Sequence, residues 1–132
     1  MLFRSFGPLG KGYLTGTIDE HTQFAAGDFR NMIPRFTPEA RKANGALKEV
    51  LAMLAARLQV TPAQLALGWL LARKPWIVPI PGTRKLERLE ENAAAAAFRL
   101  TPADVEAVEE AAGRVAVTGA RYPEPLEKMT GR

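Results

Sequence analysis

The sequence predicts an α/β fold in which a pair of parallel strands is packed against helices. Two short apolar segments, residues 1–6 and Trp76–Ile80, are the predicted strands. The chain between them carries two amphipathic helical patterns, and strands joined by a helical crossover are parallel. A glycine-containing turn follows each strand directly. Two parallel strands are too few for an ordinary covered sheet, so the pair is expected to belong to a larger structure.

Composition limits the classes of function. The chain has 132 residues, of which 47% are hydrophobic, enough for one domain with a core. It has no cysteine, which excludes disulfides and fits a cytoplasmic protein, and its single histidine, His21, argues against a His-based metal site. The net charge of +4 is spread along the chain, which favours an anionic small molecule over nucleic acid. No apolar stretch is long enough to cross a bilayer, and we expect no membrane partner.

The first strand places Met1, Phe3 and Ser5 on one face and Leu2, Arg4 and Phe6 on the other. The segment Gly7–Gly12 follows it, and three glycines with a lysine can expose backbone N–H groups to a phosphate. The segment matches neither the P-loop nor the GxGxxG pattern, and taken alone it is explained better as a plain turn.

Residues 15–36 have no sustained periodicity, and a loop of this length in a compact domain is often a lid or a binding loop. His21 lies in it without a serine, cysteine or carboxylate in a triad-like context, so we interpret it as an exposed loop residue.

Three helices are predicted to begin at Thr-Pro pairs, since threonine caps a helix and proline suits its first position. The predicted ranges are 38–58, 62–73 and 102–112. Gln64 and Asp104 complete capping boxes. Trp69 is interpreted as a core residue of the second helix. Tyr122, in the tail, is expected to pack back onto the body.

The second strand, Trp76–Ile80, is predicted to be buried, because it is short, apolar and β-branched. Pro81-Gly82 ends it, and Thr83 is expected to cap a helix that begins near Arg84. The first turns of that helix would carry three basic side chains, followed by a carboxylate and an amide: Arg84, Lys85, Arg88, Glu91 and Asn92. A helix N-terminus with basic side chains after a glycine turn predicts an anion site.

In order and spacing, these motifs closely resemble the C-terminal part of an aldo/keto reductase. The segments that carry the resemblance are Gly7–Gly16, Pro34–Phe36, Asn44, Thr61–Leu67, Trp69–Leu71, Pro79–Thr83 and Arg88–Asn92. The resemblance implies a (β/α)8 barrel, a fold that typically needs roughly 250 residues. Residues 1–132 would then be one partial domain: the last two strands, their helices and the C-terminal tail.

The resemblance also implies a site for NADP(H). Leu9, Gly10 and Lys11 would lie along the pyrophosphate, and Phe6 would stack on the nicotinamide. Gly7 would line the same site, and it stands where the family usually has serine. The remaining positions would hold the 2′-phosphate, which favours NADP over NAD, and contact the adenine: Gly82, Thr83, Arg84, Lys85 and Arg88 for the phosphate, Glu91 and Asn92 for the base.

Aldo/keto reductases reduce carbonyl compounds by hydride transfer from NADPH, using a tyrosine, a lysine, an aspartate and a histidine from the first half of the barrel. No motif resembling those four occurs here, so we assign no catalytic residue and expect the chain to be a truncated or split form carrying the cofactor-phosphate half of the site. A small carbonyl compound would be its substrate only once the missing half is supplied. The alternative is a non-catalytic fragment or interaction module that pairs through exposed strand edges with another chain or a second copy.

Overall fold

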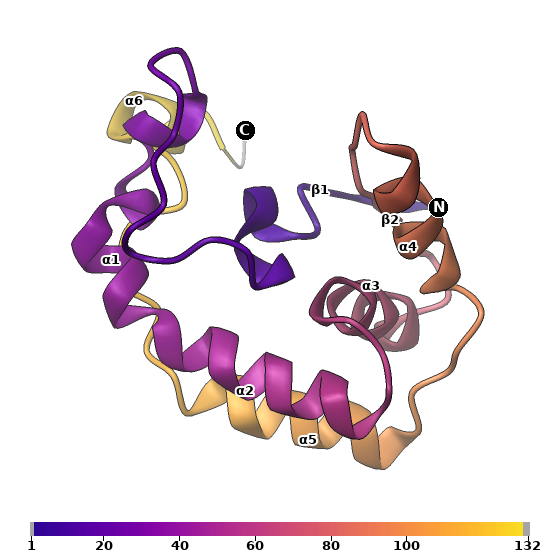
Figure 1. Ribbon diagram of the computed structural model, residues 1–132. Coiled ribbons are helices and arrows are strands. Elements are labelled where there is room, and N and C mark those ends of the chain that lie inside the picture. Colours follow the sequence, from indigo (N-terminus) through magenta and orange to yellow (C-terminus); the bar gives the residue numbers. More distant parts are fainter. Residues whose placement is uncertain (1, 131–132) are drawn as a thin grey trace.

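The computed structural model describes residues 2–130, a set of helices with a small two-stranded sheet at one side (Figure 1). The strands are β1 (Phe3–Phe6) and β2 (Ile77–Ile80). The helices are α1 (Pro38–Ala43), α2 (Gly45–Arg57), α3 (Pro62–Arg73), α4 (Leu86–Ala94), α5 (Pro102–Gly113) and α6 (Glu124–Glu127), with 3-10 helices at Gly10–Thr15, Phe29–Met32 and Pro34–Phe36.

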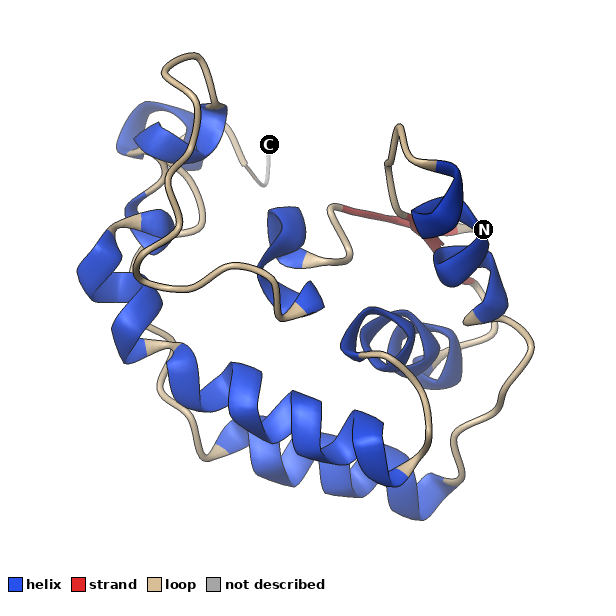
Figure 2. Ribbon diagram, in the orientation of Figure 1, coloured by secondary structure: helices blue, strands red, loops and turns tan. Residues whose placement is uncertain are grey.

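The predicted parallel pair is confirmed, and Figure 2 shows it as two neighbouring strands beside α3. β1 and β2 pair in parallel, with Arg4 opposite Val78 and Phe6 opposite Ile80. Because side chains alternate along a strand, these four side chains share one face of the sheet. Ser5 and Ile77 belong to the opposite face, which packs toward α3.

The prediction that the second strand is buried is wrong. Trp76, Val78 and Ile80 are 48%, 39% and 44% exposed. A continuous apolar run is typical of a strand that is covered on both faces. Helices cover only one face of this narrow sheet, so the apolar side chains on the other face are exposed. Met1, predicted to extend β1, lies outside the described residues.

The main core lies where α2, α3 and α5 meet (Figure 1). Leu51 and Ala55 of α2 contact Leu65 of α3 and Val108 of α5, and Leu65 is completely buried. Trp69 packs against this cluster, as predicted.

The three Thr-Pro helix starts are confirmed. Thr37, Thr61 and Thr101 each accept a hydrogen bond from the backbone N–H three residues later. Gln64 and Asp104 return a side-chain bond to complete the capping boxes, at 3.0 Å in both cases.

The single helix predicted over 38–58 is instead two helices, α1 and α2, which meet at Asn44. The Asn44 amide is 1% exposed and binds the tail, donating to the carbonyl of Thr118 at 2.9 Å and accepting from its N–H at 2.7 Å. The helical sequence pattern continues through Asn44 without a break. The role of Asn44 depends on its contact with Thr118, which is distant in sequence, so the pattern could not predict it.

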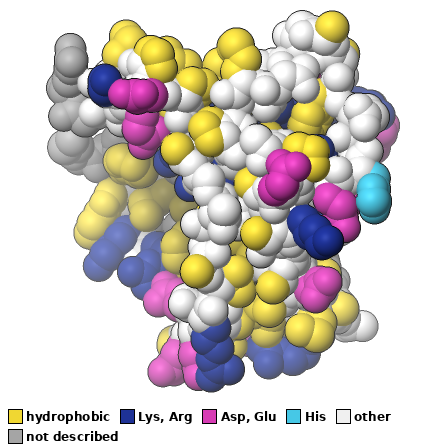
Figure 3. All heavy atoms as spheres, turned by 90° about the vertical axis from the view of Figure 1, so that its left-hand side faces the viewer, with side chains coloured by type: hydrophobic (Ala, Val, Ile, Leu, Met, Phe, Trp, Pro, Cys, Tyr) yellow, Lys and Arg dark blue, Asp and Glu magenta, His cyan; other side chains and the backbone are white. Residues whose placement is uncertain are grey.

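The long loop after β1 has a small core of its own, formed by Tyr13, Ile18, Ile33 and Phe36. The Tyr13 hydroxyl donates to the carbonyl of Arg41 at 2.9 Å, and burial raises the pKa of this phenol. His21 projects from the loop with its side chain 86% exposed, as predicted, and is the cyan group in Figure 3.

Within residues 2–130, no single helix has the length and apolar character to cross a membrane. Only α2 and α3 taken together are long and apolar enough, and the chain bends by 84° between them.

Asp28 gives the long loop a measurable pH dependence. Hydrogen bonds from the Arg30 side chain and its N–H lower the pKa of Asp28 from 3.8 to about 2. A carboxylate whose pKa is lower in the folded than in the unfolded state stabilises the fold at pH values above the unfolded-state pKa. This stabilisation is lost as the pH falls through the folded-state pKa. Wild-type stability should therefore decline between about pH 4 and pH 2. Acid unfolding followed by circular dichroism should show a smaller decline over this interval for Asp28→Asn, and equal declines would contradict the assignment.

Candidate functional site

The turns that follow β1 and β2 face each other across a hollow of about 230 Å³. Both strands end at the same edge of the sheet, so the segments after Phe6 and Ile80 are brought together although they are distant in sequence. Eight residues of the predicted cofactor site line this hollow, together with several others. The predicted ones are Gly7, Leu9, Lys11, Gly82, Thr83, Arg88, Glu91 and Asn92, with Ala63, Pro81, Thr15 and Thr17 among the remaining lining residues.

A second, shallower hollow continues from the first. Gly82, Thr83 and Arg88 line both, and Arg84 and Lys85 line only the second. The basic side chains of the predicted phosphate site therefore lie on one continuous surface.

The helix that carries this surface begins later than predicted, at Leu86 rather than near Arg84. Thr83 does not cap it. Its hydroxyl instead accepts from the N–H of Lys85 at 3.2 Å, a local turn that competes with the helix. Arg84 and Lys85 consequently belong to the connecting loop, and Arg88 is the basic residue inside α4.

The glycine loop after β1 has an unusual backbone. Gly7, Gly10, Lys11 and Gly12 all have positive φ, at 61°, 58°, 57° and 93°. Glycine adopts this conformation freely, whereas Lys11 does so at a steric cost. The tight loop that results turns its backbone back toward the 3-10 helix Gly10–Thr15, with the N–H of Leu14 bonded to the carbonyl of Leu9 at 3.2 Å.

Supporting residues hold the two walls of the hollow, and the sequence reasoning missed them. Arg30, oriented by Asp28, donates to the carbonyl of Lys11 at 3.4 Å. The amide of Gln64 at the start of α3 donates to the carbonyl of Glu91 at 3.2 Å, which ties α4 to α3. The capping-box pattern correctly placed Gln64 in the first turn of α3. No local pattern indicated that Arg30 contacts Lys11 or that Gln64 contacts Glu91.

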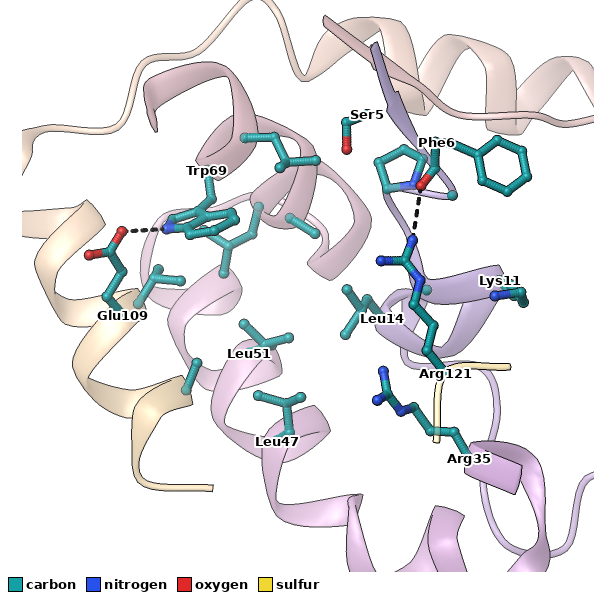
Figure 4. Close-up of a pocket in the computed structure, with 18 of the residues that line it drawn as sticks. Ser5, Phe6, Lys11, Leu14, Arg35, Leu47, Leu51, Trp69, Glu109 and Arg121 are labelled. Atoms are coloured by element: carbon teal, nitrogen blue, oxygen red, sulfur yellow. Dashed lines mark hydrogen bonds between the residues drawn. The ribbon is translucent and has the colours of Figure 1, made fainter. Parts of the chain in front are cut away.

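Two predicted residues lie elsewhere. Phe6 and Gly10 line a larger, mainly apolar cavity of about 390 Å³, bounded by β1, the glycine loop and the inner faces of α2, α3 and α5. Figure 4 shows this cavity between Leu14, Leu47 and Leu51, with Trp69 at one end donating to Glu109 at 3.2 Å. Trp69 is thus both a core residue and part of a cavity wall. The Phe6 side chain is 68% exposed on the uncovered face of the sheet.

The hollow suits an anionic group. Among residues 2–130, no carboxylate forms an ion pair with Lys11, Arg84 or Arg88, while Lys85 lies 3.9 Å from Glu87. A Cβ built on Gly7 or Gly82 would meet nothing within 4 Å, so both glycines leave the hollow open at its walls. Basic side chains without carboxylate partners beside open backbone form a surface that can bind phosphate oxygens.

Among residues 2–130, neither a tyrosine nor the histidine lines this hollow. Tyr13 is buried against Arg41, His21 is exposed in the long loop, and Tyr122 packs its ring on Lys11. Among residues 2–130, no group of three His, Cys, Asp or Glu side chains could hold a metal ion. The charged side chains that line the hollow, Lys11, Arg88 and Glu91, form an arrangement that can bind and orient an anion.

Comparison with known proteins identifies relatives along most of the chain. The model of the family described as "Aldo/keto reductase family" matches residues 2–112. A Schizosaccharomyces pombe protein named aldo-keto reductase yakc, with NADP(+) in its name, is 42% identical over 118 residues, or 89% of this chain and 35% of that protein.

Two further relatives agree with this match. The Strobilurus tenacellus protein aldo-keto reductase str7 is 36% identical over 117 residues, covering 89% of this chain and 35% of its own length. The Glycine max protein probable aldo-keto reductase 1 is 35% identical over 130 residues, covering 95% and 36%. The chain thus spans about a third of the length of the curated relatives it matches.

Proposed function

The chain belongs to the aldo/keto reductase family, and we propose that it is the segment of a carbonyl-reducing oxidoreductase that binds the phosphates of NADP(H). One observation carries the proposal: the hollow between the two post-strand turns gathers Lys11, Thr83 and Arg88 beside open glycines. The NADP(+) in the name of a relative at 42% identity supports the same cofactor.

The second, shallower hollow provides the basis for preferring NADP(H) to NAD(H). Arg84, Lys85 and Arg88 surround it, and guanidinium groups bind phosphate in bidentate fashion. A 2′-phosphate at this surface would be neutralised by Arg84 and Arg88, while the pyrophosphate would lie nearer Lys11. Glu91 and Asn92, which also line the first hollow, would then contact the adenine.

The bound cofactor would supply the hydride, and this chain's own residues would hold its phosphates in place. In (β/α)8 barrels a phosphate site is often formed by the loops after the seventh and eighth strands together with a helix N-terminus. The positions of the Gly7–Gly12 loop, the Pro81–Lys85 loop and α4 correspond to that arrangement, which supports a barrel for the complete protein. The substrate we propose is a small carbonyl compound, acted on only together with the rest of such a barrel.

The charge of Arg88 provides the direct test of cofactor binding. Hydrogen bonds to charged groups contribute about 1.5–3 kcal/mol, so Arg88→Ala should weaken NADPH binding about tenfold or more and leave NADH binding nearly unchanged. Isothermal titration of the 132-residue chain with both nucleotides measures this. Arg99→Ala, which removes the same charge outside both hollows, is the matched control. Absence of NADPH binding to the wild-type chain, or an equal loss in the control, would contradict the proposal.

The pure 132-residue chain should not oxidise NADPH with a carbonyl compound, because none of its described tyrosines or its histidine reaches the hollow as a proton donor. The measurement is the loss of NADPH absorbance in the presence of a small aldehyde, with a complete aldo/keto reductase as positive control. Turnover above the blank that disappears in Arg88→Ala would show that this chain contains its own acid.

The uncovered face of the sheet favours a second candidate function, self-association of a non-catalytic module. Phe6, Val78 and Ile80 share that face and are 68%, 39% and 44% exposed. A second copy could cover these side chains or add strands to the sheet edges.

Light scattering over a range of concentrations tests self-association. The wild-type chain should form dimers or larger species, and Val78→Thr with Ile80→Thr should shift it to monomer by removing apolar contact area. Met53→Thr on α2, where Met53 is 66% exposed away from the sheet, is the control. A wild-type monomer at every concentration would exclude this second function.

A further inference from the structure

The tail segment Thr118–Tyr122, here called the tail clamp, is fastened to the body at two neighbouring points. Thr118 exchanges two hydrogen bonds with the buried Asn44 amide, and the carbonyl of Gly119 accepts from Arg35 Nε at 3.1 Å. Gly119 has φ +91°, and a Cβ on it would lie 2.7 Å from the Cα of Arg35. Only glycine fits so close to the Arg35 backbone, so the start of the clamp is held in one position.

Beyond this anchor, the last two residues of the clamp, Arg121 and Tyr122, contact the two ends of the segment Phe6–Lys11. Arg121 Nη2 donates to the carbonyl of Phe6 at 3.4 Å, where the glycine loop begins. Lys11 Nζ lies over the Tyr122 ring, 4.3 Å from its centroid, near the end of that segment. Figure 4 shows Arg121 reaching Phe6, with Lys11 further along the same segment.

Lys11 combines an unusual backbone conformation with an ammonium that contacts an aromatic ring. Its backbone has φ 57°, a conformation that non-glycine residues adopt at a cost. No described carboxylate pairs with its ammonium, and the Tyr122 ring face provides the attraction instead. An ammonium has three donors, and a ring on one side leaves donors free for phosphate oxygens on the other.

We propose that Tyr122 is a positioning residue for the diphosphate of the cofactor: its ring holds the Lys11 ammonium at the wall of the hollow, and the tail clamp holds the glycine loop. This inference rests on the proposed function and adds to it a role for the tail, which lies beyond the residues that the family model matches.

The test compares two nucleotides and two substitutions on the 132-residue chain. NADPH contains the diphosphate, whereas adenosine 2′-monophosphate carries only the phosphate expected at Arg84 and Arg88. Tyr122→Ala should weaken NADPH binding about two- to fivefold, the range of an exposed cation–π contact, and leave adenosine 2′-monophosphate binding unchanged. Tyr122→Phe, which keeps the ring, should bind both as the wild type does. Leu126→Ala, in the tail beyond the clamp, is the matched control.

A second measurement reports on the clamp without any nucleotide. With isotope-labelled methyl groups on the lysine amines, the Lys11 resonance should show an aromatic ring-current shift, identified by its absence in Lys11→Arg. The shift should persist in Tyr122→Phe and vanish in Tyr122→Ala.

The outcomes separate this inference from the proposed function. NADPH binding that is the same in Tyr122→Ala and wild type, or a Lys11 shift that survives Tyr122→Ala, overturns the role of Tyr122 and leaves the cofactor site standing. Equal weakening of both nucleotides also overturns it, since that result indicates general damage to the fold. A wild-type chain with the ring-current shift but no NADPH binding overturns the cofactor site itself, and the role of Tyr122 with it.

Discussion

Parallel pairing of β1 with β2 is the constraint on which the rest of the molecule depends. The two strands are about seventy residues apart in the chain, and α3 packs beside them as part of the crossover. Because parallel strands end at the same edge, the pairing brings the Gly7–Gly12 loop next to Pro81–Lys85. An antiparallel pair would have put these loops at opposite ends of the strands, and Lys11 and Arg88 would not share a hollow.

The sheet and the helical core differ in how completely their apolar side chains are covered. Helices cover only one face of the two-stranded sheet, so apolar side chains on the other face, such as Val78 and Ile80, remain exposed. The core between α2, α3 and α5 is better covered, because the three helices turn their apolar faces toward one another around Leu65. The candidate site lies at the junction of these two regions, and both walls are bonded to neighbouring elements through Arg30 and Gln64.

Most of the candidate site is built by loops rather than by the sheet itself. Lys11, Arg84 and Lys85 are loop residues, and their positions depend on contacts such as the Thr83 hydroxyl with the N–H of Lys85. Loops of this kind need support from elsewhere in the chain. Asn44 and Gly119 supply it for the tail, and the tail in turn contacts the first glycine loop at Phe6 and Lys11.

The sequence by itself determined the features that depend on neighbours along the chain. Thr61 with Gln64 and Thr101 with Asp104 specify helix starts, the short apolar runs specify strands, and the turn residues specify where each strand ends. Only the tertiary structure decided the break at Asn44, the delayed start of α4, the exposure of Ile80 and the contact between Tyr122 and Lys11. Each of these features depends on whether a segment distant in sequence packs beside the residue, and on which segment it is. Periodicity and capping patterns describe only neighbours along the chain and cannot predict such contacts.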